Sequence, residues 1–79
     1  MREIREFDVV RVVALRHPEL DRNVGAALER APAVGEEGVG LEIERKAEGT
    51  AVYVVESVTA RGDTTWLSEL AHDEVELVE

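Results

Sequence analysis

Residues 39–67, VGLEIERKAEGTAVYVVESVTARGDTTWL, decide the fold because they carry three strand patterns separated by glycine turns. Apolar and polar residues alternate in the first pattern, which predicts a strand with Val39, Leu41 and Ile43 on its buried face. The second pattern is rich in valine, whose β-branched side chain favours an extended backbone. The three predicted strands are residues 39–44, 50–59 and 64–67.

Two further strand patterns flank this stretch and complete a five-stranded fold. The segment from Phe7 to Leu15, FDVVRVVAL, carries valine on both faces, so we expect neighbours to cover it well. Asp8, Val10 and Val12 take one face, and Val9, Arg11 and Val13 take the other. Residues 75–78 are predicted to form the closing strand, after a polar turn or a single 3-10 turn at residues 68–74. Five strands with short connections predict a small all-β barrel, which also hides the sheet edges.

One short helix is predicted at residues 20–31, within an insertion at about 18–32. The signals are apolar residues at helical spacing, a capping residue and a terminating proline: Leu20, Val24, Ala27, Leu28, Ala31, Asp21 and Pro32. Gly25 costs such a helix about 1 kcal/mol relative to alanine. One or two helical turns, or a structured loop, therefore remain the alternatives, and residues 1–79 are expected to form a single domain.

The chain is short and strongly acidic. It has 79 residues, no cysteine and a formal net charge of −9. Such a charge repels nucleic acid and anionic membrane surfaces, so neither is expected as a partner. An acidic surface either simply keeps the protein soluble or fits a basic protein partner. The lack of cysteine and of an apolar signal segment near Met1 predicts a cytoplasmic location.

Four motifs follow one another in a recognisable order. They are FDVVRV at 7–12, VGEEGVGLEI at 34–43, YVVES at 53–57 and GDTTWLSELAHDEVELV at 62–78. This order resembles a family of small bacterial SH3-like barrels, which are related to KOW-type barrels and have no assigned function. The chain departs from that family at Ser57, where an aromatic residue is usual, and in the length of residues 17–33. The resemblance implies a five-stranded SH3-like barrel and says little about activity.

A second, looser resemblance is to the C-terminal barrel of the nitrile hydratase β subunit. Its R-x-P element, glycine turn and Y-x-V strand correspond to Arg30-Ala31-Pro32, residues 35–38 and Tyr53-Val54-Val55. That subunit supports a metal-bearing partner and brings no metal ligands itself. The resemblance implies an accessory role, although this chain is shorter than a whole subunit and lacks the tryptophan-rich end.

Residues that could carry catalysis or bind a metal are few. Ser68, His72 and Asp73 have the side-chain types of a nucleophile, a base and an orienting acid, but sequence neighbours usually point apart. His17 and His72 lie 55 residues apart, and cysteine is absent, so no metal site is expected. The sequence therefore predicts no catalytic residue, no cofactor and no metal.

Two glycine-containing motifs have a simple structural interpretation. The loop at residues 35–40 contains three glycines but also two glutamates, and a strand follows it, so we expect a turn and not a phosphate cradle. Arg61-Gly62-Asp63 matches the cell-adhesion tripeptide, yet its place between two strands predicts a hairpin turn.

Trp66 is the candidate partner-binding residue, together with Val52 and Val54. If Leu67 points inward, the alternation of the strand turns Trp66 outward, beside the two valines of the neighbouring strand. An exposed aromatic side chain among valines is typical of a protein-binding anchor. The alternative is that Trp66 fills the barrel, because the chain has only three aromatic residues to supply bulk.

These observations favour a non-enzymatic protein–protein interaction module that binds a protein partner or further copies of itself, and no small-molecule substrate. Valines on both faces of residues 7–15 and 50–59 support this hypothesis, because a thin sheet has only one interior to offer. An antitoxin or an immunity protein would fit such an acidic module. The alternatives are an accessory barrel for a nitrile-hydratase-like metal enzyme and an RNA-associated barrel, although the net charge argues against RNA.

Overall fold

The regular structure of the chain is almost entirely β. Residues 3–26, 30–45 and 51–79 are described in the computed structural model. The strands are β1 (Val9–Val12), β2 (Glu37–Arg45), β3 (Ala51–Val58), β4 (Thr64–Ala71) and β5 (Val75–Leu77). Two single turns of 3-10 helix are η1 (Val24–Ala26) and η2 (His72–Glu74). The all-β class predicted from the sequence is confirmed.

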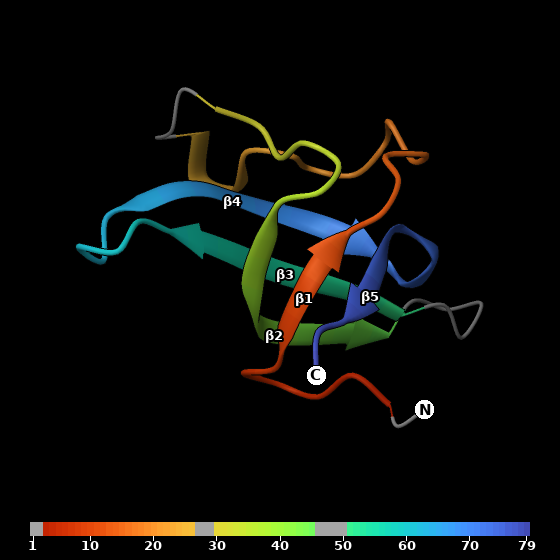
Figure 1. The fold of residues 1–79 in the computed structure, drawn as a ribbon. Helices are drawn as coiled ribbons and strands as arrows, with labels where there is room; N and C mark the ends of the chain where they lie inside the picture. The colour runs from red at the N-terminus through yellow and green to blue at the C-terminus, as the bar shows by residue number, and fades with distance from the viewer. Residues whose placement is uncertain (1–2, 27–29, 46–50) are drawn as a thin grey trace.

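The five strands form one antiparallel sheet that coils on itself. Their order is β4-β3-β2-β1-β5, and η2 is the link between β4 and β5. β2 carries an extra residue between Gly40 and Glu42 where it pairs with β3. A bulge of this kind bends a strand and increases its twist. Figure 1 shows β2 bending, so that β1 and β5 lie across β3 and β4 in the manner of a small barrel.

Inward-facing side chains of four strands build the core. Val10, Val55, Trp66 and Leu70 are fully buried, and the partly buried Ile4 packs against them. β3 presents its residues at 51, 53 and 55 to the core cluster. Because successive residues of a strand point to opposite faces, the core cluster occupies one face of β3.

The inward face of β2 differs from the prediction in its first half. Val39 lies opposite the exposed Val9, whereas Gly38 and Gly40 are buried. The prediction that Val39 faces the core is therefore wrong, because the bulge after Gly40 reverses the alternation. Beyond the bulge, Ile43 packs against the core as predicted.

The insertion is a loop in its described part. No α-helix forms at residues 20–26, where η1 is the only helical turn, and Gly25 within it has a φ of 82°. That φ is left-handed and ends a right-handed helix, so of the two alternatives the described part has the structured loop, with a single 3-10 turn in it. Residues 27–29 lie outside the described residues.

This loop lies along the outer edge of β4. The backbone N–H of Glu69 donates to the carbonyl oxygen of Asp21 at 2.8 Å, and the N–H of Asp21 donates to Glu69 Oε1 at 2.9 Å. Figure 1 shows the segment following β4 along that edge. Such pairing protects an edge strand from another chain. β4 continues to Ala71, four residues beyond the predicted end at Leu67.

Replacing Gly38 with alanine is expected to destabilise the fold. A Cβ there would lie 2.7 Å from both the carbonyl oxygen of Glu56 and Val55 Cγ1, so the backbone of β3 would have to move. Overpacking costs about 1–3 kcal/mol, which should appear as a lower urea midpoint. Gly40→Ala is the matched control, because its Cβ would meet nothing closer than 3.8 Å. Equal losses in both variants would contradict the packing explanation.

Candidate interaction surface

Exposed apolar side chains gather along β1 and its continuations. Five of the six large apolar residues that the described part of the chain exposes come from residues 7–15 and from position 34. They are Phe7, Val9, Val13, Leu15 and Val34, which we name the β1 outer surface. The even-numbered Val10 and Val12 between them are buried, so the predicted division of these residues between two faces is confirmed, but the expectation that neighbours cover both faces is wrong for the outer one. Only residues 9–12 form the strand, which is shorter than the predicted 7–15.

Two cross-strand rows give this surface its chemistry. Val9 lies opposite Val39 of β2, and the N–H of Val78 donates to the carbonyl oxygen of Val9 at 2.9 Å. The next row is ionic, because Arg11 contacts Glu37 at 3.0 Å and Glu76 at 2.8 Å. The hydrogen bonds that Arg11 donates to Glu76 and Glu37 raise its pKa. The outer face of β1 therefore alternates an apolar row with a Glu–Arg–Glu row.

Trp66 belongs to the core and is no exposed anchor. It lies opposite Ser57 on the inner face of the β3–β4 pair, is 0% exposed, and donates its indole N–H to Glu36 Oε1 at 3.2 Å. Of the two alternatives for Trp66, the structure has the one in which it fills the barrel. Val52 is also buried and Val54 is partly buried, on the opposite face of β3. The expected exposed cluster of these three residues is absent.

A buried carboxylate joins the insertion loop to the end of β4. Glu74 is 0% exposed, and Arg22 holds it with two hydrogen bonds, Nη1 to Oε1 at 2.9 Å and Nη2 to Oε2 at 2.6 Å. Three backbone N–H groups also donate to the carboxylate: those of Arg16 at 2.5 Å, His17 at 3.0 Å and Ala71 at 2.9 Å. The buried pair of Glu74 and Arg22 was not predicted from the sequence.

The protonation of Glu74 follows from these contacts. Burial alone would raise the pKa of its carboxyl group, but the hydrogen bonds from Arg22 and the three backbone amides outweigh burial and lower the pKa to about 2. Arg22 also donates to the carbonyl oxygens of Glu69 and His17, so its guanidinium connects several segments. The pair is ionic at neutral pH, and both carboxylate oxygens of Glu74 and both terminal nitrogens of Arg22 are engaged within the chain.

The possible nucleophile, base and acid do not assemble. Ser68 is buried and donates its hydroxyl to the carbonyl oxygen of Glu69, while His72 Nδ1 lies 3.2 Å from the hydroxyl of Tyr53. Asp73 turns instead to His17, with 2.8 Å between Oδ1 and Nε2. His72 and Asp73 thus have different partners, as expected for sequence neighbours. Among the described residues, no three histidine or acidic side chains are placed to hold a metal ion.

The two glycine-containing motifs behave as turns. Gly35 has a φ of 95° and donates its N–H to the carbonyl oxygen of Val12, which starts the β1–β2 pairing. Gly62 has a φ of 89° and donates to the carbonyl oxygen of Thr59 in the hairpin between β3 and β4. Both positions need the left-handed backbone that glycine adopts readily.

A shallow pocket lies between the N-terminal segment and the adjoining ends of β2 and β3. It has a volume of about 300 Å³ and is lined by Glu3, Ile4, Ile43, Arg45, Ala51, Tyr53 and His72. Burial raises the pKa of Tyr53, so the phenol stays protonated next to His72. Arg45 and Glu3 face each other at 3.7 Å. The polar groups of the pocket thus largely contact one another.

No family model, curated protein or solved structure matches this chain. The resemblances to SH3-like barrels of unassigned function and to the nitrile hydratase β subunit therefore stay predictions. None of the helices in the described residues has the length and apolar character that crossing a bilayer requires.

Glu74→Gln should lower the free energy of unfolding by about 3–5 kcal/mol at pH 7, which is the usual cost of breaking a buried ion pair. Because folding lowers the pKa of Glu74 from 4.5 to about 2, its contribution is present above pH 4.5 and is lost as the pH falls toward 2. Urea unfolding at several pH values measures both effects, and the variant should lose part of this acid dependence. Glu76→Gln is the control, since its exposed pair with Arg11 is worth at most about 1 kcal/mol. A Glu74 variant as stable as the parent would contradict this role.

His17 should titrate above its ordinary pKa of 6.5, chiefly because Asp73 accepts a hydrogen bond from its ring. The charged ring then stabilises the fold fully below pH 6.5, and this contribution is lost as the pH rises through the raised pKa. Proton NMR of the His17 ring measures the pKa, which Asp73→Asn should lower. Glu19→Gln is expected to lower it less, because the Glu19 contact is longer at 3.3 Å. A pKa that Asp73→Asn leaves unchanged would rule out this cause.

Proposed function

We propose that this protein is a non-enzymatic protein-binding module and that the β1 outer surface is its docking face. One observation carries the proposal: of the six large apolar side chains exposed in the described residues, five belong to residues 7–15 and to position 34. Scattered exposed apolar residues are ordinary on small proteins, but a gathered set is typical of an interaction site.

The size of this surface suits a specific but moderate interaction. Burying a valine, leucine or phenylalanine completely contributes roughly 1.5–3 kcal/mol, and a half-exposed side chain contributes about half of that. The surface as a whole then offers several kcal/mol, which is comparable to the roughly 4–15 kcal/mol that association costs in lost motion. Apolar contact alone is therefore marginal, and the charged rows beside it must contribute.

The engagement of the polar side chains supports a binding role rather than a catalytic one. Glu74 and Arg22 are committed to each other and to the backbone, and Ser68, His72 and Asp73 have separate partners. An enzyme needs a nucleophile, an acid or a base that converge on a reacting atom. In this chain the same residue types hold loops in place.

An antitoxin or an immunity protein is the kind of binding module that fits an acidic domain of this size. In that role the acidic surface would neutralise a basic toxic partner. Co-expression of a neighbouring gene product that slows growth, with and without this protein, tests that process directly.

A photo-crosslinking amino acid at Val13 is expected to give one discrete adduct with a partner in the cells that make the protein. The same amino acid at Ala60, exposed on the hairpin between β3 and β4, should give none. A second substitution, Val9→Asp, should remove the adduct from position 13 while circular dichroism stays unchanged. Adducts from both positions, or none together with a monomer in light scattering, would contradict the proposal.

A further inference from the structure

We infer that Phe7 is the anchor of the β1 outer surface and that its partner is a basic, arginine-bearing protein segment. This inference rests on the proposed function and adds the contact residue and the chemistry of the partner. Three observations carry it: the backbone at Phe7, its exposure, and the charge of the molecule as a whole.

Phe7 occupies a turn position that normally takes glycine. The N–H of Asp8 donates to the carbonyl oxygen of Arg5 at 3.1 Å, which closes a four-residue turn with Glu6 and Phe7 in the middle. Phe7 has a φ of 70° and is the only non-glycine residue with a positive φ in the described part of the chain. A positive φ at the third position defines a type II turn, where glycine or asparagine is usual. A phenylalanine therefore strains this turn.

Hydrogen bonds within the chain hold this turn, but the fold does not bury the side chain of Phe7. Phe7 is 71% exposed as a residue, more than any other large apolar residue described. The turn is nevertheless fixed, because Phe7 N–H donates to the carbonyl oxygen of Gly40 at 2.5 Å and Arg5 N–H donates to Asp8 Oδ2 at 2.7 Å. A strained backbone that holds an aromatic ring rigidly in solvent is typical of a binding site.

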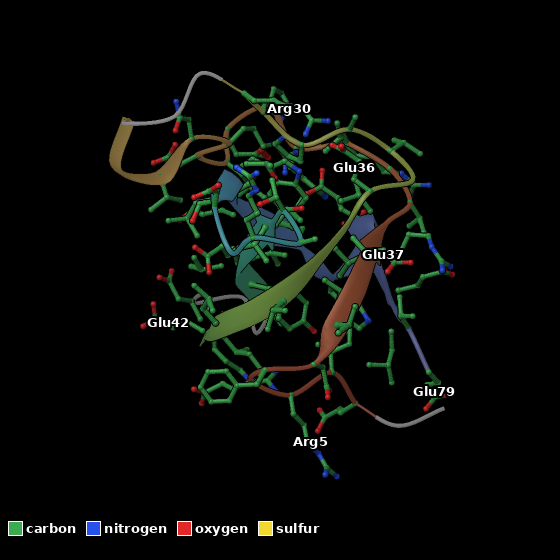
Figure 2. The ribbon with its side chains drawn as sticks, turned by 60° about the vertical axis from the view of Figure 1, so that its left-hand side comes forward. Arg5, Arg30, Glu36, Glu37, Glu42 and Glu79 are labelled. Carbon is green, nitrogen blue, oxygen red and sulfur yellow. The ribbon has the colours of Figure 1, made fainter. Side chains whose placement is uncertain are left out.

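The charge of the molecule as a whole favours a basic partner, and it outweighs the single positive charge of Arg5 in the turn. Five of the seven arginines in the described residues already pair with acidic side chains of the same chain. These five are Arg11, Arg16, Arg22, Arg30 and Arg45. The excess negative charge of −9 is therefore left to act on other molecules. In Figure 2, Glu42 lies at the left-hand side of the molecule and Arg5, which belongs to the turn, lies at the bottom.

A guanidinium group fits this combination of groups. Arginine stacks on an aromatic face while it pairs with carboxylates, and Glu6, which precedes Phe7 in the turn, is exposed. Glu37 and Glu76, which flank Arg11 on the same face, supply further acceptors for a cationic segment. A second copy of this chain is disfavoured, because it would bring two molecules of net charge −9 together.

The probe is an eight-residue peptide that alternates arginine and leucine, titrated into the ¹⁵N-labelled protein at low and at moderate salt. We expect chemical-shift changes at residues 6–13, and binding that weakens with salt. A peptide that alternates glutamate and leucine should leave the spectrum unchanged. Equal binding of both peptides would overturn the basic partner.

The variant Phe7→Gly tests the role of the ring in binding without destabilising the fold. Glycine accepts the positive φ without strain, so the melting temperature should hold or rise, whereas the affinity for the arginine peptide should fall at least tenfold. The variant keeps the net charge, so non-specific attraction would be unaffected. Phe7→Asn repeats the test with a second residue that tolerates this backbone. Val58→Ala, which removes an exposed valine from the end of β3, is the matched control and should change the affinity less than twofold.

Unchanged affinity in both Phe7 variants would overturn the anchor. If the arginine peptide fails to bind while position 13 still crosslinks to a partner, the inference fails and the proposed function stands. If the peptide binds as expected and the crosslink is missing, the proposed function fails instead. A dimer in sedimentation that Phe7→Gly dissociates would identify a second copy as the occupant and overturn the basic partner.

Discussion

The carboxylate of Glu74 is the point at which separate segments of the chain meet. A charge removed from water costs several kcal/mol unless other groups replace the lost hydration. Arg22 and three backbone amides do so here with five hydrogen bonds. The same contacts fix the loop after β1 and the turn between β4 and β5. A protein of 79 residues can bury only a small apolar core. The hydrogen bonds around Glu74 and Arg22, the buried polar hub, supply part of the stability that apolar contacts would provide in a larger domain.

The internal ion pairs, including the one in the hub, also determine which charges the surface can present to a partner. Its arginine and four others are paired with acids of the same chain, so most basic side chains stabilise the loops and sheet instead of facing a partner. The chain has 18 acidic and nine basic residues, so an excess of nine negative charges has no basic residue of the chain to neutralise it. The same sheet buries Val10 and Val12 and leaves Val9 and Val13 outside. An acidic background with an apolar face is thus a consequence of how the fold uses its residues.

The sequence predicts the local features well, because these depend on near neighbours. Five strands, the two faces of β3 and the hairpin at Gly62 follow from alternation and turn chemistry. The differences from the predictions arise where residues distant in the sequence determine the local structure. The bulge after Gly40 reverses β2, and the pairing of Arg22 with Glu74, 52 positions away, favours a loop over a helix. Charged residues are normally exposed, so nothing local marks these two as buried.

The candidate site was harder to predict than the fold for a related reason. Trp66 has a side chain suited to anchoring a partner, but large side chains are few in this sequence, and Trp66 fills the core instead. Phe7, the remaining large apolar aromatic, was assigned to a strand because valines follow it. Its left-handed φ depends on how the turn meets Gly40 of a strand more than 30 residues later. Selection for stability alone would favour glycine at that position, since the ring gains little burial. The stability of the isolated fold therefore does not account for a phenylalanine at this position, and this is the reason the anchor is proposed there.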